Sequence, residues 1–82
     1  MQQALIQLHP RDNVAVARVA LQADSEVQQA DGAPLQVRAA IAAGHKVALR
    51  AIAAGEVVLK YGQPIGVASQ PIAAGEHVHV HN

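Results

Sequence analysis

The sequence contains no cysteine, phenylalanine, tryptophan or threonine, and Tyr61 is its only residue of the Phe, Tyr and Trp class. Without cysteine, a disulfide framework and a cysteine-type zinc site are excluded. The core must be built from Val, Ile, Leu and Ala, which bury less surface per residue than aromatic rings do. At 82 residues the chain forms one small domain. Such a domain has marginal stability, so we expect support from a partner surface or from self-association into a homo-oligomer.

Neither charge nor long hydrophobic runs dominate the chain. Six basic and six acidic residues are scattered along it, which argues against a nucleic-acid partner, because that needs a basic stripe. No apolar run approaches the ~20 residues of a membrane span. The N-terminal stretch MQQALIQLHPRDN also lacks the charged and apolar regions of a secretion signal. The sequence therefore predicts a cytoplasmic protein without a membrane or nucleic-acid partner.

A seven-residue phrase occurs three times, at residues 41–47, 52–58 and 72–78, each copy beginning with Ile-Ala-Ala-Gly and ending with Val. A fourth, degraded copy at residues 21–27 carries Asp24 in place of the glycine. Gly and Asp are both favoured where a turn needs a positive φ. The phrase predicts a buried aliphatic residue, a tight turn at position four and a strand whose Val points inward. The copies start eleven and twenty residues apart, which argues against a solenoid of fixed period.

The alanine content also permits a helical interpretation, with residues 37–60 as one long helix. That helix would contain two interior glycines, at about 1 kcal/mol each relative to Ala, and several β-branched valines. Strands and turns are therefore favoured. The expected strands cover residues 4–8, 13–19, 35–39, 46–50, 57–61, 65–68 and 77–81, with a turn or hairpin tip at 28–34. The predicted fold class is small, irregular and all-β, with little helix.

The C-terminal stretch HVHVHN alternates, so His77, His79 and His81 fall on one face of a strand. Same-face side chains on a strand start about 6.6–7 Å apart, and two imidazoles can converge from there on one metal ion. Neutral imidazole suits Zn, Fe, Mn or Cu. These three histidines are therefore candidate metal ligands. The alternative is a terminal strand with a solvated polar face.

Three further residues are candidates for substrate binding. His45 directly follows a turn glycine, and loop tips often carry functional groups. Lys46 is next to it and can pair with an acidic group. Tyr61 either supplies a hydroxyl at a cleft or fills a core of small residues. For each of the three, an exposed or structural role is the competing interpretation.

Four stretches together resemble one known family: DNVAVA at residues 12–17, GHKVAL at 44–49, KYGQPIG at 60–66 and GEHVHVHN at 75–82. They are similar to the N-terminal SAF domain of the altronate and galactarate dehydratase family, and the likeness extends over residues 12–82. The resemblance implies a β-clip fold, which antifreeze-like and sialic-acid-synthase C-terminal domains share. Asp24 departs from the glycine expected in the first turn.

The resemblance further implies a hydro-lyase that dehydrates a sugar acid of the altronate or galactarate type to a 2-keto-3-deoxy acid. Such an enzyme uses a divalent metal, Fe²⁺ or Mn²⁺, and a large C-terminal catalytic domain or large subunit. This chain would be the small partner of that unit, inactive alone. His45 and Lys46 are then expected to face the substrate carboxylate or a hydroxyl, and the terminal histidines the metal.

Two alternatives come from other functional classes. The first is an independent carbohydrate- or ice-binding domain, which would favour a flat, threonine-rich surface. The second is a stand-alone metal-binding protein that uses the histidine strand.

Overall fold

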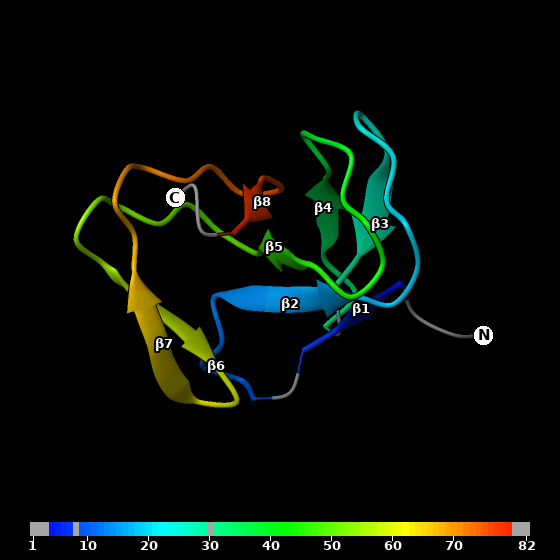
Figure 1. Ribbon diagram of the computed structural model, residues 1–82. Helices are drawn as coiled ribbons and strands as arrows, with labels where there is room; N and C mark the ends of the chain where they lie inside the picture. Colours follow the sequence, from blue (N-terminus) through cyan, green and yellow to red (C-terminus); the bar gives the residue numbers. More distant parts are fainter. Residues whose placement is uncertain (1–3, 8, 30, 80–82) are drawn as a thin grey trace.

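The computed structural model describes residues 4–7, 9–29 and 31–79, which form short strands and no helix (Figure 1). The strands are β1 (Leu5–Ile6), β2 (Val14–Ala17), β3 (Glu26–Gln28), β4 (Pro34–Gln36), β5 (Lys46–Ala48), β6 (Val57–Lys60), β7 (Gln63–Val67) and β8 (His77–Val78). All pairings are antiparallel, with a central sheet of order β1-β2-β5-β8 and two separate hairpins, β3–β4 and β6–β7. Figure 1 shows these hairpins on opposite sides of the central sheet. The all-β prediction is confirmed, and the helical alternative is wrong.

Every copy of the repeated phrase makes the turn that its sequence predicts. φ is 87° at Gly44, 85° at Gly55 and 87° at Gly75, and Asp24 adopts the same region with φ 65°. The aliphatic residue at position one is almost fully buried in all four copies, which are represented by Leu21, Ile41, Ile52 and Ile72. Valine at position seven is buried in three copies and half-buried in the fourth. The Asp24 departure therefore leaves the turn conformation intact.

The four turns build two equivalent halves that follow each other directly, residues 17–47 (the first half) and 48–78 (the second half). One pair of aliphatic residues forms a bridge in each half, Leu21 with Ile41 and Ile52 with Ile72. Equivalent residues thus lie 31 positions apart. The turn amides repeat the pattern, since Gly44 donates to Ala17 and Gly75 to Ala48, both over 2.8 Å. The spacing of the phrase conceals this period because each half holds two copies.

Buried side chains form two clusters, one centred on each half and completed by residues that precede the first half. The first contains Leu5, Ala15, Ala17, Leu21, Leu35, Val37, Ile41 and Val47. The second contains Val14, Ala48, Ile52, Val58, Ala68, Ile72 and Val78. Neither contains an aromatic ring, as the composition requires. Tyr61 is 61% exposed, so the idea that its ring fills the core is wrong.

Two buried polar residues before β2 hold the β6–β7 hairpin. The Asn13 side chain donates to the carbonyl of Val57 over 2.9 Å and accepts from the amide of Leu59 over 2.8 Å. The carboxylate of Asp12 accepts from the amides of Tyr61 and Gly62, at 3.0 and 2.7 Å. The DNVAVA stretch therefore joins the second-half hairpin to the central sheet. Because the groups are buried, the hydrogen bonds are costly to break.

Most strands are shorter than expected, and β7 begins earlier than expected, at Gln63. The expected turn at residues 28–34 is shorter, because residues 26–28 and 34–36 pair as a hairpin. Each of these strands alternates over only three residues around a single inward residue, Val27 or Leu35, so the alternation is too short to signal a strand. The expected strand at 77–81 is described only as far as residue 79, and β8 covers its first two residues. Within the described residues, no helix is long and apolar enough to cross a membrane.

Candidate metal centre

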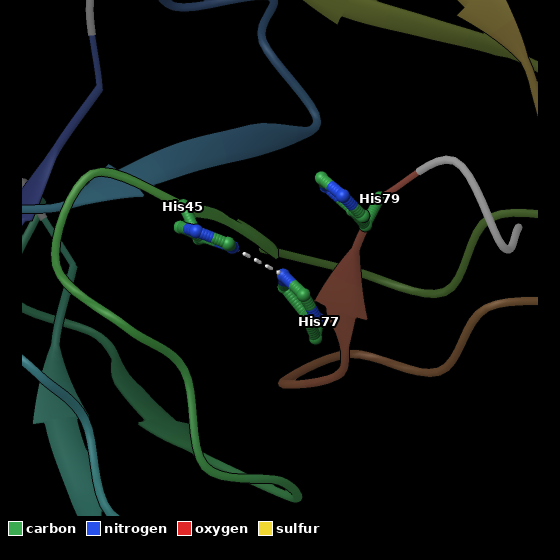
Figure 2. Close-up of side chains that lie close together, drawn as sticks. All are labelled: His45, His77 and His79. Atoms are coloured by element: carbon green, nitrogen blue, oxygen red, sulfur yellow. Dashed lines mark hydrogen bonds between the residues drawn. The ribbon is translucent and has the colours of Figure 1, made fainter.

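Three histidines converge where β5 and β8 pair at the edge of the central sheet. Lys46 of β5 lies opposite Val78 of β8. Continuing this register by one residue places His45 opposite His79, and His77 shares the face of His79 because side chains alternate. Figure 2 shows the three rings side by side, with His45 entering from the turn before β5 and the other two from β8 and the residue after it.

The ring nitrogens are close enough to share one ligand. Nδ1 of His45 lies 2.9 Å from Nε2 of His77, the contact drawn as a dashed line in Figure 2. The ring centroids are 5.1 Å apart for this pair and 5.4 Å apart for each pair that includes His79. One nitrogen from each ring lies within 4.8 Å of the other two. His45 and His77 are half-buried and His79 is exposed, so the group opens to solvent on the His79 side.

This donor set fits a divalent transition metal. Bonds of about 2.0–2.1 Å from a tetrahedral metal place its nitrogen ligands roughly 3.4 Å apart. Small rotations of the three rings bring their nitrogens, which lie within 4.8 Å of one another, to this spacing. Neutral imidazole binds Zn, Fe, Mn and Cu, and three protein ligands leave a position open for water or substrate, as in catalytic sites. The three-histidine group can therefore act as an open metal site.

His45 occupies position five of its copy, where the two other glycine-containing copies carry glutamate. Oε1 of Glu56 accepts from the amide of Ala53 at 3.0 Å, and Oε1 of Glu76 accepts from the amide of Ala73 at 2.6 Å. These two carboxylates close their own turns. His45 instead contacts a side chain of β8. The substitution at this position therefore replaces a local turn contact with a contact between two strands.

Lys46 alternates with His45 and points to the other side of the sheet. There it lines an open depression of about 360 Å³, together with Val58, Ile65, Gly66, Val67, Ser69, Val78 and His79. His79 thus belongs both to the three-histidine group and to the rim of the depression. The lining of the depression combines an ammonium group and an imidazole with mostly apolar side chains, a combination that suits a carboxylate-bearing molecule.

Tyr61 lies in the two-residue turn between β6 and β7, away from β8 (Figure 1). Its φ of 59° and the 71° of Gly62 are typical of a type I′ turn. The exposed ring lies beneath Lys60, whose Nζ is 5.3 Å from the ring centroid. The structure does not bring Tyr61 together with His45 or Lys46, and its role in substrate binding stays a prediction.

The sequence separated His45 from the terminal histidines, whereas the structure places it with His77 and His79. His81 lies outside the described residues, so its metal role also stays a prediction. The repeated phrase contained a signal for the grouping that sequence reasoning missed. Position five carries Glu in two glycine-containing copies and His in the third. The strand that follows the His45 turn, β5, pairs with β8, the strand that follows the Gly75 turn.

Comparison with known proteins identifies the family to which the chain belongs. The family model of the altronate/galactarate dehydratase SAF domain matches residues 3–82. The chain belongs to this family. The fold described above is thus that of a small all-β SAF domain.

Two relatives match this SAF domain over nearly its whole length. It is 51% identical over 77 residues to an altronate dehydratase of Escherichia coli (strain K12), covering 94% of the chain and 15% of that enzyme. It is 44% identical over 79 residues to an altronate dehydratase of Bacillus subtilis (strain 168), covering 96% of the chain and 16% of that enzyme. The chain therefore spans about a sixth of the length of these relatives.

A third relative is named as a separate subunit. The SAF domain is 53% identical over 47 residues to the alpha subunit of a (2R)-sulfolactate sulfo-lyase from Chromohalobacter salexigens. That match covers 57% of the chain and 50% of the subunit. Related sequences thus occur both within a long dehydratase and within a short subunit of a lyase.

Proposed function

We propose that this SAF domain is the accessory module of a sugar-acid dehydratase and supplies His45, His77 and His79 to the metal of the reaction centre. The observation that carries the proposal is the convergence of one nitrogen from each ring within 4.8 Å. Its support from the comparisons is the matched family and the dehydratases of which the domain forms 15–16%. The proposed reaction is loss of water from an altronate- or galactarate-type acid to give a 2-keto-3-deoxy acid.

The proposed metal is Fe²⁺ or Mn²⁺, which acts as a Lewis acid on the negative charge that develops next to the substrate carboxylate. In this proposal the chain holds the metal and orients the substrate. His45 and His77 are half-buried and held by the β5–β8 pairing, so their rings are positioned before any ligand arrives. Lys46 and His79 line the neighbouring depression, where the ammonium group suits the substrate carboxylate.

The groups that remove the proton and assist the departing hydroxide belong, in this proposal, to a larger domain or subunit that completes the enzyme. The SAF domain corresponds to only 15–16% of the dehydratases it matches, so in this proposal it is inactive alone. The metal, the substrate, the large partner and the cytoplasmic location remain predictions.

The test is a dehydratase in which this 82-residue sequence replaces the matched segment of the Escherichia coli enzyme. His45→Gln removes a ring nitrogen but keeps a side-chain oxygen that can accept a turn amide, as glutamate does in the other copies. We expect Fe²⁺ or Mn²⁺ affinity, measured by equilibrium dialysis, to fall by at least about 100-fold, since loss of outer-shell partners alone costs 10–100-fold. kcat/KM should fall in parallel.

The matched control is His9→Gln, which removes an imidazole that packs beside Gly62 in another part of the domain. It should leave metal affinity unchanged. If His45→Gln and His77→Ala both retain the parent metal affinity and kcat/KM, the proposed role of the histidines is wrong.

The stand-alone metal-binding alternative is supported by one observation, that all three ligands come from this single chain. Calorimetry of the isolated 82-residue protein with Zn²⁺, Mn²⁺ and Fe²⁺ distinguishes the accessory role from the stand-alone metal-binding role. The accessory role predicts weak binding, because three imidazoles are then only part of the coordination sphere. Tight binding by the isolated chain would favour the alternative.

A further inference from the structure

The two halves provide an internal comparison of two hairpins with the same backbone plan. In β3–β4 an exposed cross-strand pair is polar, Glu26 opposite Gln36. The equivalent pair in β6–β7 is Val57 opposite Val67. These valines are 40% and 60% exposed, and Ile65 beside them is 49% exposed. The two hairpins therefore share a backbone plan, but the first presents a polar surface and the second an apolar one.

The neighbouring cross-strand pair differs in a second way. In the first half Leu35 lies opposite Val27, is almost fully buried and belongs to the core cluster of that half. In the second half Gly66 lies opposite Val58. A Cβ built on Gly66 has no atom within 4 Å, and its φ is not in the left-handed region. The backbone conformation at position 66 therefore does not require glycine. The missing side chain leaves open the space that Leu35 fills in the first half.

The open space is the depression next to the candidate metal centre. Its lining includes Val58, Gly66, Val67 and Val78, and its rim includes His79. The apolar strip of Val57, Ile65 and Val67 is continuous with it through Ile65 and Val67. A protein that covers the strip and enters the depression therefore also reaches His79, one member of the histidine group. Exposed, contiguous apolar surface of this kind marks an interaction site.

We propose that the strip of Val57, Ile65 and Val67 is the surface on which the large domain or subunit of the dehydratase docks, and that an apolar side chain of this partner fills the part of the depression next to Gly66. The part lined by Lys46 and His79 stays available for the substrate carboxylate. The inference rests on the proposed function, because it assigns the position of the partner relative to the histidines. A β-branched cross-strand pair gives a rigid apolar contact. The docked large domain or subunit then covers the three-histidine group on the His79 side, where the group is open to solvent in this structure.

The large part of the dehydratase is the occupant that fits, rather than a second copy. The chain accounts for 15–16% of the altronate dehydratases it matches, so in those enzymes a much larger polypeptide is tethered to the domain. Tethering raises the effective concentration of that surface far above that of another copy. The adjacent histidines also leave metal positions that a partner can fill, which a contact between two identical strips does not explain.

Cysteine labelling tests the docking surface. The chain has no cysteine, so Val67→Cys introduces one reporter on the strip and Val19→Cys a control on an exposed apolar residue elsewhere. Iodoacetamide labelling is compared between the isolated 82-residue protein and the intact dehydratase that carries this sequence, after subtraction of the parent background. We expect Cys at 67 to react at least roughly tenfold more slowly in the intact enzyme, since interface cores pack as densely as protein interiors. Cys at 19 should react equally in both.

Gly66→Leu tests the depression. In the isolated protein it should raise the midpoint of thermal unfolding, because the new side chain fills space that Leu35 fills in the first half. In the intact dehydratase it should restore fast labelling at position 67, because the leucine occupies the place of the partner side chain. Gly66→Ala is the control and should change the labelling little. A lower unfolding midpoint for Gly66→Leu would show that the depression is not a vacant leucine site and would overturn the proposal, even if the intact enzyme does not assemble.

Other outcomes separate this inference from the proposed function. Equal labelling of position 67 in both proteins would refute the docking surface. Protection that already appears in the isolated protein and rises with its concentration would identify a second copy as the occupant. His45→Gln should leave the protection at position 67 unchanged. Loss of metal affinity with protection intact, or the reverse, therefore shows which proposal has failed.

Discussion

The hairpin of the first half closes on itself, whereas the hairpin of the second half is held by residues from outside it. In the first, Oδ1 of Asp31 accepts from the amide of Ala33 at 2.9 Å, within the same turn. In the second, the turn amides are bound by Asp12 and the β6 backbone by Asn13. The turns of the two hairpins thus depend on contacts of different range. A short hairpin is marginal alone, and the second half obtains its support from the central sheet.

This difference indicates which positions are constrained by the fold and which have diverged. Position one, position four and position seven of the phrase keep their residue classes in all four copies, because burial and positive φ restrict them. Position five and the exposed hairpin residues differ between the halves. The candidate metal centre and the proposed docking surface both lie at diverged positions. The following substitutions test this division, starting with the largest expected effect.

The turns at Gly75 and Gly55 have nearly the same φ but different surroundings. A Cβ on Gly75 would overlap the backbone carbonyl oxygen of Gln36, whereas a Cβ on Gly55 meets open space. We expect Gly55→Ala to lower the free energy of unfolding by about 1–2 kcal/mol, the cost of a left-handed residue. Gly75→Ala should cost more than about 4 kcal/mol, since the overlap involves backbone that has to move. Urea unfolding followed by circular dichroism measures both, and equal midpoints would contradict the close approach.

Asn13→Ala removes the side chain that joins the second-half hairpin to the rest. The carbonyl of Val57 and the amide of Leu59 lose their partner, and Asn13 is buried. We expect a loss of about 2–3 kcal/mol, because buried polar groups left unpaired cost about 1–3 kcal/mol each. Asp31→Ala in the exposed turn of the first half is the control, with an expected loss below about 1 kcal/mol. Similar losses for the two variants would show that the hairpins are supported alike.

Tyr61→Asn tests whether the type I′ turn of the second half keeps a strained residue. Asparagine tolerates positive φ and is preferred in this turn, so the variant should gain roughly 0.5–1 kcal/mol. Tyr61→Phe, which keeps the ring and the strain, should leave the stability unchanged. The predicted substrate contact is checked with the intact dehydratase. A parent-like KM in both variants would exclude a role of Tyr61 in substrate binding.

Asp24→Gly converts the degraded copy into the pattern of the other three. Glycine relieves the positive φ of 65° but loses more conformational entropy on folding, so the expected gain is at most about 1 kcal/mol. Asp24→Ala should lose about 1 kcal/mol relative to the parent, because alanine tolerates a left-handed φ less well than aspartate does. Differential scanning calorimetry resolves both changes. A gain for Asp24→Ala would mean that the turn conformation is not what selects this position.

Local rules were sufficient for the turns and for the fold class. Gly44, Gly55, Gly75 and Asp24 could be assigned to positive φ because that conformation depends on a single residue and its Cβ. Alternation likewise placed His77 and His79 on one face. The strand at residues 26–28 was missed because its alternation covers only three residues, with Val27 as the one apolar member. The 31-residue repeat was missed because two copies lie within each half.

The sequence by itself therefore determined an all-β chain of glycine-type turns with an aliphatic, ring-free core, since these follow from short-range sterics and composition. Only the tertiary structure decided that His45 joins His77 and His79, because their meeting depends on the pairing of β5 with β8, which are separated by the whole second-half hairpin. It also decided that Gly66 opens a depression beside them. Which strands become neighbours depends on how both halves pack together, and that is a property of the complete fold.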